Sequence, residues 1–443
     1  MPALKRKAYD ALMFWKEHKT KQAMLVDGAR QVGKTYIVRQ FARENYEHLA
    51  EINFIEDGTA AQAISTARNA QELFARITAF ASGEIVAGKT LIFLDEVQEC
   101  KGVPTAIKFL VDGFPQYDFV LSGSLLGVEL KNIKSVPVGY LDSMTMYPLD
   151  LEEYCCARGL PAQVLSAASA SFEGREPVDP YLHERLMGLF HEYLIVGGMP
   201  AAVDAFVRED SLPAVRSIHR NIVARYREDI TKYARRRTRT IRRIYDLVPA
   251  ELAAQDKRFI LSDINGDAHI ARYENSFLWL ADAGVALPVY NVSEPRPPLL
   301  ISQRSTYFKL FMNDVGLLTY RCGMEATREM LAGRTDVAYG AIYENYVAQE
   351  LAARGMPLYY FKSKAAGELD FLVENSLERV LPIEVKSGKT YKRHRALKNV
   401  LEIGNYSIDE ALVLCEENIE VDGKIVYAPM YCTMFMDGRK REW

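Results

Sequence analysis

The first 150 residues alternate between short apolar runs and segments that read as helices. The runs at 23–26, 90–94 and 117–121 are typical of strands that are buried on both faces of a sheet. The segment 36–41 carries apolar residues at helical spacing, and 60–80 also reads as helical. Strands interleaved with helices predict a doubly wound parallel sheet of the α/β class.

A glycine-bearing loop follows the first apolar run. Residues 28–35 read Gly-Ala-Arg-Gln-Val-Gly-Lys-Thr, two glycines separated by four residues and followed by Lys and a hydroxyl residue. This is the phosphate-binding loop pattern, and the flanking strand and helix would aim backbone N–H groups at a phosphate chain. Lys34 can reach the β- and γ-phosphates, and the Thr35 hydroxyl can bind Mg²⁺. The candidate nucleotide-binding residues are Gly28, Ala29, Arg30, Gln31, Val32, Gly33, Lys34, Thr35 and Tyr36.

Two acids end the second apolar run, and two serines follow the third. Asp95, together with Thr35, would hold Mg²⁺, and Glu96 would polarise the water that attacks the γ-phosphate. The alternative for an acidic pair at this position is a helix cap. Ser122 and Ser124 are both candidates for a hydrogen bond to the γ-phosphate or its water, and the sequence does not choose between them. The candidate catalytic residues of this site are Lys34, Glu96 and Ser124, and the expected cofactors are ATP and Mg²⁺.

A second group of chemically suited residues lies near the C-terminus. Asp370 is near the start of one predicted strand, and Glu384 and Lys386 share one face of the next because side chains alternate. Two carboxylates would bind a divalent cation, and Lys386 could orient or activate a water for phosphodiester hydrolysis. Glu344, on a helix predicted over 341–351, is an additional candidate ligand. The alternative is a surface salt bridge on an ordinary strand. The candidate catalytic residues here are Asp370, Glu384 and Lys386, and the candidate metal ligands are Asp370, Glu384 and Glu344.

The middle of the chain holds a local excess of arginine. The segment 225–243 carries nine basic residues against Glu228 and Asp229. Three interpretations stay open: a solvated helix face, contacts with the phosphate backbone of DNA or RNA, and arginines that serve the ATP site of a neighbouring copy. Residues 240–293 resemble a winged-helix unit, which binds DNA or packs domains together.

Composition limits the remaining possibilities. At 443 residues the chain needs several domains, and its net charge of −3 gives no global attraction to nucleic acid or to an anionic membrane. The six cysteines have no C-x-x-C spacing, which indicates free thiols and argues against structural zinc. The most apolar stretch, 193–203, is interrupted by glycines and is too short to span a bilayer. We therefore expect a cytoplasmic protein with no membrane partner.

The motif set resembles a family of prokaryotic AAA+ ATPases that carry a C-terminal domain of unknown function, DUF4143. The resemblance rests on the glycine loop, Leu-Asp-Glu-Val-Gln at 94–98, Leu-Ser-Gly-Ser at 121–124, Tyr-Pro-Leu at 147–149 and Tyr-Leu-Ile-Val-Gly-Gly-Met-Pro at 193–200. It implies ATP binding, hydrolysis and assembly into homo-oligomers in a bacterial or archaeal cytoplasm. Relatives often carry a basic residue at the position of Tyr140, so an arginine finger is not expected there.

The C-terminal acids resemble the PD-(D/E)xK nuclease superfamily, whose sheet and leading helix would match residues 335–430. The expected domains are an ATPase core at 1–150, a helical connector at 151–235, a winged-helix-like unit at 236–305 and a restriction-endonuclease-like α/β domain at 306–443. The leading hypothesis is an Mg²⁺-dependent ATPase whose nucleotide state controls a nuclease-like module acting on DNA or RNA. The alternative is a nucleotide-dependent switch or scaffold, in which a catalytically inactive nuclease-like domain binds a partner protein.

Overall fold

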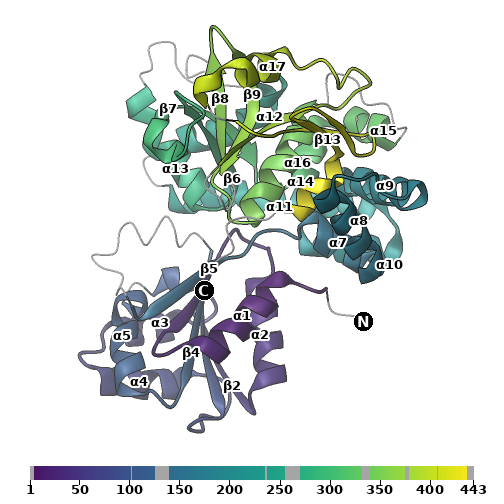
Figure 1. Cartoon of the computed structure of the whole chain (residues 1–443). Helices are drawn as coiled ribbons and strands as arrows, with labels where there is room; N and C mark the ends of the chain where they lie inside the picture. The colour runs from purple at the N-terminus through teal and green to yellow at the C-terminus, as the bar shows by residue number, and fades with distance from the viewer. Residues whose placement is uncertain are drawn as a thin grey trace. The chain divides into compact units, whose positions relative to one another are not determined.

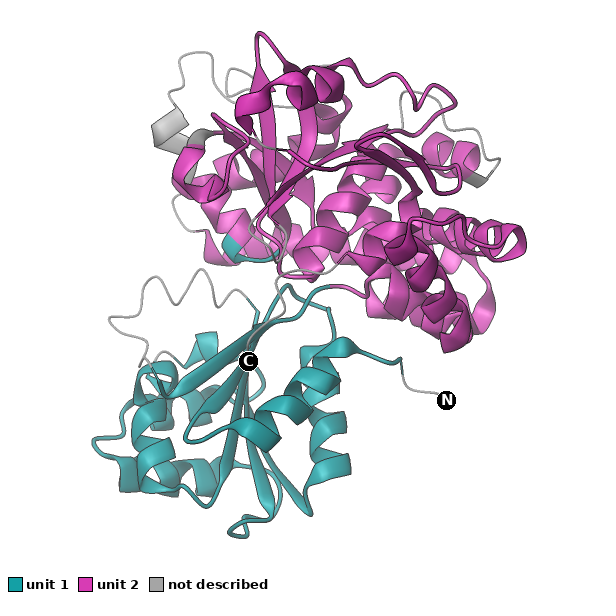
Figure 2. Ribbon diagram, viewed as in Figure 1, with its two compact units in different colours: residues 1–147, 282–284 teal, residues 148–281, 285–443 magenta. Residues whose placement is uncertain are grey.

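The computed structural model divides the chain into two compact units. Unit 1 comprises residues 1–147 with 282–284, and unit 2 comprises 148–281 and 285–443 (Figure 2). The described residues are 4–100, 102–124, 139–234, 237–254, 270–331, 340–374, 379–406 and 408–436. In this part of the chain no helix combines the length and the apolar character needed to cross a membrane.

A parallel sheet forms the centre of unit 1. Its described strands are hydrogen bonded in the order β2-β3-β4-β1-β5, and every neighbouring pair is parallel. Their bounds are β1 Ala23–Asp27, β2 His48–Asn53, β3 Thr90–Asp95, β4 Asp118–Gly123 and β5 Leu141–Thr145. The strands predicted from the three apolar runs are all present, so the doubly wound parallel sheet is confirmed.

Helices cover both faces of this sheet (Figure 1). The described helices of unit 1 are α1 Lys7–His18, α2 Lys34–Asn45, α3 Gly58–Ser65, α4 Ala70–Phe80 and α5 Val103–Gly113. The sequence analysis expected a single helix over 60–80, but the structure has α3 and α4. Asn69 separates them, because its side chain accepts a hydrogen bond from the amide of Glu72 and so caps the start of a new helix.

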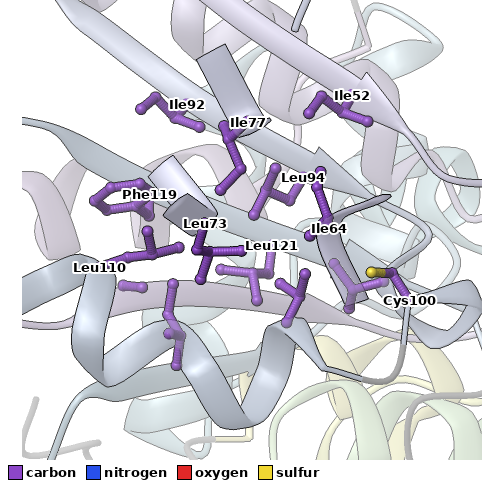
Figure 3. Packing of buried hydrophobic residues seen from close by; sticks show 14 of the residues in the cluster. Ile52, Ile64, Leu73, Ile77, Ile92, Leu94, Cys100, Leu110, Phe119 and Leu121 are labelled. Atoms are coloured by element: carbon purple, nitrogen blue, oxygen red, sulfur yellow. The ribbon is translucent and has the colours of Figure 1, made fainter. Parts of the chain in front are cut away.

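The core between the sheet and α3, α4 and α5 follows from alternation along the strands. Ile92 and Leu94 of β3 and Phe119 and Leu121 of β4 point to this face and are buried. They meet apolar side chains of the three helices, as Figure 3 shows. On the opposite face α2 packs against β2, β3 and β4, and α1 packs against α2. The carboxyl ends of β1, β3 and β4 are thereby fixed at one edge of the sheet.

A mixed sheet forms the centre of unit 2. Its described strands have the order β12-β13-β11-β10-β9-β8-β6-β7, with both parallel and antiparallel neighbours. Their bounds are β6 Ala286–Val292, β7 Gln303–Met312, β8 Tyr359–Ser363, β9 Gly367–Glu374, β10 Val380–Val385, β11 Ala411–Cys415, β12 Glu420–Asp422 and β13 Ile425–Pro429. This agrees with the α/β class expected for the C-terminal region, while the likeness to a nuclease stays a prediction.

Helices pack on this sheet and beside it. The described helices of unit 2 are α7 Leu151–Ala157, α8 Ala162–Gly174, α9 Pro180–Val196, α10 Pro200–Glu209, α11 Leu212–Tyr233, α12 Thr238–Ala253, α13 Ile270–Asp282, α14 Val315–Cys322, α15 Met324–Leu331, α16 Gly340–Ala353 and α17 Arg395–Glu402. Every residue of α16 from Ala341 to Ala352 is buried, and the helix packs against β6, β7 and β10. The apolar side of α17 joins a separate core cluster with β8, β9 and β11. The mixed sheet therefore also lies between helices.

The predicted winged-helix segment is only partly described. Of residues 240–293, the stretch 255–269 lies outside the described residues. β6, at the end of this segment, pairs antiparallel with β7 and parallel with β8, so it is a strand of the mixed sheet. The predicted boundary at 305 falls within β7. The winged-helix assignment and the four-part division of the chain stay predictions.

The motif at 193–200 forms the junction between α9 and α10. Gly197 ends α9 with a positive φ of 68°, and a Cβ at this position would collide with the carboxylate of Asp314. A Cβ at Gly198 would collide with the carbonyl oxygen of Leu149. The amide of Gly198 donates a hydrogen bond of 2.6 Å to Asp314 Oδ2. The two glycines are therefore required by close packing inside unit 2.

Candidate active site

The glycine loop joins β1 to α2 at the carboxyl edge of the sheet in unit 1. Gly28 has a φ of 142°, and a Cβ there would collide with the carbonyl oxygen of Met146. Gly33, with a φ of 96°, caps the start of α2 in the left-handed conformation. Both glycines meet requirements that a side chain would violate. The loop amides and the start of α2 together form the kind of concave backbone surface that binds phosphate.

Lys34 is buried at the start of α2, and its ammonium lies over the loop. Its Nζ donates hydrogen bonds to the carbonyl oxygens of Gly28, at 2.9 Å, and Ala29, at 2.8 Å. A third hydrogen bond of 3.3 Å goes to Ser124 Oγ. Burial lowers the pKa of Lys34, while the nearby carboxylate of Glu96 opposes this shift by favouring the charged form. The ammonium is therefore held in place by neutral oxygens.

Thr35 and Asp95 meet beside the loop. Thr35 Oγ1 donates a hydrogen bond of 2.9 Å to Asp95 Oδ2, and Asn53 Nδ2 donates one of 3.1 Å to the same oxygen. The Ser122 hydroxyl donates to the other oxygen, Oδ1. Burial raises the pKa of Asp95, and the bond from Ser122 counteracts this. A hydroxyl and a carboxylate oxygen in contact are hard ligands that fit Mg²⁺.

Glu96 lies next to this pair, with its backbone in the left-handed region at a φ of 56°. Gln98 Nε2 donates a hydrogen bond of 2.6 Å to Glu96 Oε2. The hydroxyl of Ser124 donates to the same carboxylate at 3.2 Å, and the Ser124 amide donates at 3.3 Å. The structure thus distinguishes the two serines: Ser122 contacts Asp95, whereas Ser124 lies between Lys34 and Glu96.

These side chains line a cavity of about 460 Å³. The lining residues are Arg30, Gln31, Gly33, Lys34, Thr35, Tyr36, Arg39, Arg43, Glu96 and Ser124. The lining thus includes Lys34, Glu96 and Ser124, most of the predicted loop residues, and two arginines from elsewhere in α2, Arg39 and Arg43. A concave surface of this size with an excess of positive charge suits a polyanionic small molecule.

The predicted C-terminal residues lie on neighbouring elements of unit 2. Asp370 is on β9, and its Oδ2 accepts a hydrogen bond of 2.9 Å from the amide of Val385. Glu384 is on β10, and Lys386 is the first residue after this strand. Their side chains form an ion pair of 2.7 Å. Burial raises the pKa of Glu384 to about 8, and Asp370 adds to this rise. Glu344 is buried on α16.

The predicted metal ligands in unit 2 do not form a metal site in this structure. Across the described residues, no group of three or more His, Cys, Asp or Glu side chains is arranged to hold a metal ion. One oxygen of Glu384 contacts the ammonium of Lys386, and one oxygen of Asp370 is used by the backbone of β10. As the side chains stand, these oxygens of Glu384 and Asp370 are engaged within the domain and face an ammonium group and a backbone amide.

Comparison with family models supports the interpretation of both units. Residues 20–155 match the model described as an AAA domain. The chain carries an AAA-type ATPase domain. Residues 339–433 match the domain of unknown function DUF4143, and residues 187–328 match a further domain of unknown function, DUF8612. The expected pairing of an AAA domain with a C-terminal DUF4143 domain is thereby confirmed.

Three solved structures show a distant likeness to the chain. The Walker-type ATPase paby2304 of Pyrococcus abyssi is 14% identical, with a TM-score of 0.43, covering 72% of this chain and 96% of that one. A Drosophila ORC structure bound to DNA is 12% identical, with a TM-score of 0.28 and coverages of 74% and 96%. The ORC1 protein of Aeropyrum pernix in complex with DNA is 14% identical, with a TM-score of 0.24 and coverages of 74% and 90%. No curated protein matches the chain.

Three residues of unit 1 contact the site and were not assigned a role from the sequence. Asn53 lies opposite Asp95 on the neighbouring strand. Its position at the end of β2 is the one sequence feature from which its contact with the site could have been predicted. Gln98 stands two residues after Glu96. Arg6 is buried and donates hydrogen bonds to the carbonyl oxygens of Val32, at 3.0 Å, and Tyr147, at 2.6 Å. Nothing in the local sequence identifies this arginine as a support of the loop.

The arginine-rich segment is partly engaged within unit 2. Arg225 forms an ion pair of 2.9 Å with Glu228, and Arg227 forms one of 2.8 Å with Asp246. Residues 235 and 236 lie outside the described residues. Four further arginines in or beside the first turns of α12 are exposed: Arg237, Arg239, Arg242 and Arg243. The segment therefore combines structural ion pairs with an exposed basic group.

Proposed function

We propose that this chain binds ATP at residues 28–36 and hydrolyses it to ADP and phosphate with the help of Mg²⁺. The proposal rests on three kinds of chemical group that lie close together at one edge of the sheet. Lys34 supplies a cation, the contact between Thr35 and Asp95 supplies oxygen ligands, and Glu96 supplies a carboxylate. Ser124 connects the first and the last of these. P-loop ATPases need this set of groups for hydrolysis.

Each side chain has a defined part in the reaction. The loop amides and the start of α2 bind the phosphates, and Lys34 stabilises the negative charge that develops on the γ-phosphate. Glu96 accepts a proton from the attacking water, and Ser124 holds the Glu96 carboxylate in place. When bound between Thr35 and Asp95, Mg²⁺ would neutralise phosphate charge. The hydroxyl of Ser124 links the carboxylate proposed to activate the water with the ammonium proposed to hold the γ-phosphate, which supports this division of roles.

The proposal is tested by replacing Glu96 with Gln in the full chain. Glu96→Gln keeps an oxygen for Gln98 and Ser124 but cannot accept a proton, so turnover should fall by about 10²- to 10⁴-fold. ATP affinity, measured by calorimetry, should change by less than about threefold, since the phosphates are bound by other groups. Glu99→Gln, in the same turn, is the matched control and should retain wild-type turnover. Phosphate release at the wild-type rate from Glu96→Gln, or no release from the wild type with Mg²⁺, would contradict the proposal.

We also propose that the exposed arginines of α12 contact the phosphate backbone of DNA or RNA. Arg237, Arg239 and Arg242 support this because they are exposed and close in sequence. Replacing one of them, Arg242→Ala, should reduce the salt slope of binding by about 0.9 for each lost contact. The exposed Arg68→Ala in unit 1 serves as the control. An unchanged slope would favour the solvated face, whereas a loss of ATP turnover that wild-type subunits restore would favour an arginine serving another copy.

For the C-terminal domain we propose the switch rather than the nuclease. In this version the nucleotide state of the AAA domain controls the binding of a partner by a DUF4143 domain that does not cut nucleic acid. The ion pair between Glu384 and Lys386, and the lack of a metal-binding group among the described acids, favour it. Nucleic acid incubated with the full chain and Mg²⁺ or Mn²⁺ should stay intact. Cleavage that is lost in Asp370→Ala while ATP turnover is retained would restore the nuclease hypothesis.

A further inference from the structure

A lysine outside every sequence motif is buried at the predicted C-terminal site. Lys309 lies on β7, and its side chain is 0% exposed. Its Nζ is 2.8 Å from Glu368 Oε1 and 5.0 Å from the centre of the Tyr360 ring. Removing an ammonium from water is costly unless carboxylates surround it. The burial of Lys309 therefore requires the negative charge of the neighbouring acids.

The acids around Lys309 include those that the sequence analysis assigned to a metal. Glu368 and Asp370 are two residues apart on β9 and so share one face of the sheet. The register of β9 and β10, continued one pair beyond Phe371 and Ile383, sets Asp370 opposite Glu384. Burial alone would lower the pKa of Lys309, yet Glu344, Asp370 and Glu368 together raise it above its ordinary value. The lysine thus lies in the field of the predicted ligands.

Two further lysines complete the neutralisation of this cluster. Lys362 forms an ion pair of 2.7 Å with Glu368 Oε2, so both oxygens of Glu368 contact ammonium groups. Lys386 forms the ion pair with Glu384 Oε1. The acids of the cluster are Glu344, Glu368, Asp370 and Glu384, and its cations are Lys309, Lys362 and Lys386. Four carboxylates against three ammonium groups leave little negative charge for a divalent ion.

We propose that Lys309 is the permanent counter-ion of this carboxylate cluster and excludes divalent metal ions from it. A metal at Asp370 and Glu384 would sit beside a buried ammonium that has no route to solvent. Two like charges repel more strongly in a buried site than in water, and Asp370 lies on the same face of β9 as Glu368, which contacts Lys309. The cluster is therefore an internal network of ion pairs that stabilises the DUF4143 domain. Because it binds no divalent metal, the domain cannot cleave phosphodiester bonds by a metal-dependent mechanism. This inference does not depend on the proposed ATPase activity.

The test is a titration of the nucleotide-free full chain with Mn²⁺, with free Mn²⁺ measured by electron paramagnetic resonance. The AAA domain is identical in all variants, so any Mn²⁺ that it binds is a common background. Wild type and Asp370→Asn should bind Mn²⁺ equally. Lys309→Met, which keeps the length and removes the charge, should gain one site at least about tenfold tighter than the wild-type background, because the variant lacks the buried positive charge that opposes a cation at these acids. Adding Asp370→Asn to Lys309→Met should abolish the gain.

A second variant covers the case in which Lys309→Met does not fold. Lys309→Met/Glu368→Gln removes both partners of the fully buried ion pair, which proteins tolerate better than loss of one partner; Lys362 also loses Glu368, but its side chain is partly exposed to water. This variant should gain the same Asp370-dependent site, and circular dichroism would establish that it is folded. Mn²⁺ binding by the wild type that is lost in Asp370→Asn would overturn the proposal. A folded Lys309→Met, or a folded double variant, that gains no site would also overturn it.

Discussion

The buried carboxylate of Asp314 should give unit 2 a measurable dependence of stability on pH. Asp314 caps the start of α14, where it accepts hydrogen bonds from the amides of Gly198, at 2.6 Å, and Leu317, at 2.9 Å. Burial raises its pKa to about 6, even though these bonds favour the ionised form. The folded chain therefore holds the Asp314 proton more tightly than the unfolded chain, in which the pKa is near its ordinary value of 3.8.

The sign and size of the effect follow from this difference. Because the folded-state pKa is raised, the stability that protonated Asp314 contributes is fully present below about pH 3.8 and is lost as pH rises through about 6. At about 1.4 kcal/mol for each tenfold step, a rise from 3.8 to about 6 corresponds to about 3 kcal/mol. Asp314→Asn has no such titration. It loses an acceptor oxygen, which costs about 1 to 3 kcal/mol at every pH.

The assay is urea unfolding of wild type and Asp314→Asn between pH 4 and 7.5, followed by circular dichroism. The two units can unfold separately, so the transition that the variant shifts is assigned to unit 2. The variant should be less stable than wild type near pH 4, and this deficit should vanish or reverse by pH 7.5, because wild type loses about 3 kcal/mol over the range and the variant does not. Asp179→Asn is the matched control, since Asp179 also caps a helix, α9, but is exposed. A difference between wild type and Asp314→Asn that stays constant across this range would refute the reasoning.

Three further predictions concern the nucleotide site. Lys34→Ala removes the charge partner of the γ-phosphate and should lower turnover by about 10²- to 10³-fold in a phosphate-release assay; normal hydrolysis would remove Lys34 from the mechanism. Gly28→Ala brings a Cβ against the carbonyl oxygen of Met146 at a backbone angle that alanine avoids. Calorimetry should then show ATP affinity lowered by at least about tenfold, the equivalent of about 1.4 kcal/mol of strain, and unchanged affinity would count against the loop geometry. Arg6→Met loses two hydrogen bonds and should destabilise unit 1 by about 2 kcal/mol or more in thermal unfolding, whereas the exposed Lys5→Met should have no effect.

For the proposed nucleotide site, the sequence was sufficient to identify the residues that are contiguous in the chain. Gly28, Gly33, Lys34 and Thr35 belong to one short loop, and each residue type reflects a local requirement for backbone shape, charge or a hydroxyl. Asp95 was equally accessible because it ends a strongly apolar strand. Support from elsewhere in the chain was not accessible: Arg6 reaches the loop from a segment whose sequence has no special pattern. Its role follows only from packing.

At the C-terminal site, too, a residue from a distant segment could not be predicted, and this residue changes the interpretation of the site. Alternation along a strand correctly placed Glu384 and Lys386 together, and their ion pair is the arrangement that the sequence analysis weighed against a metal site. Lys309 enters the cluster from β7, more than fifty residues before the nearest motif acid on β9. Its strand pairs with β6, which the sequence assigned to a different domain. Non-local strand pairing leaves no periodic signal in a single sequence, so the counter-ion could not be predicted.

The two buried lysines, Lys34 in unit 1 and Lys309 in unit 2, differ in the groups that surround their ammonium ions. The ammonium of Lys34 contacts the neutral carbonyl oxygens of Gly28 and Ala29 and lines the cavity of about 460 Å³, so its charge stays available to an anionic ligand. The ammonium of Lys309 contacts a carboxylate and is fully enclosed, so its charge is already neutralised by the fold. The pKa shifts agree, since burial lowers the pKa of Lys34 whereas the acids raise that of Lys309. A cation held by neutral groups in an open cavity is suited to bind phosphate, and one enclosed by carboxylates is suited to hold a sheet and its covering helix together.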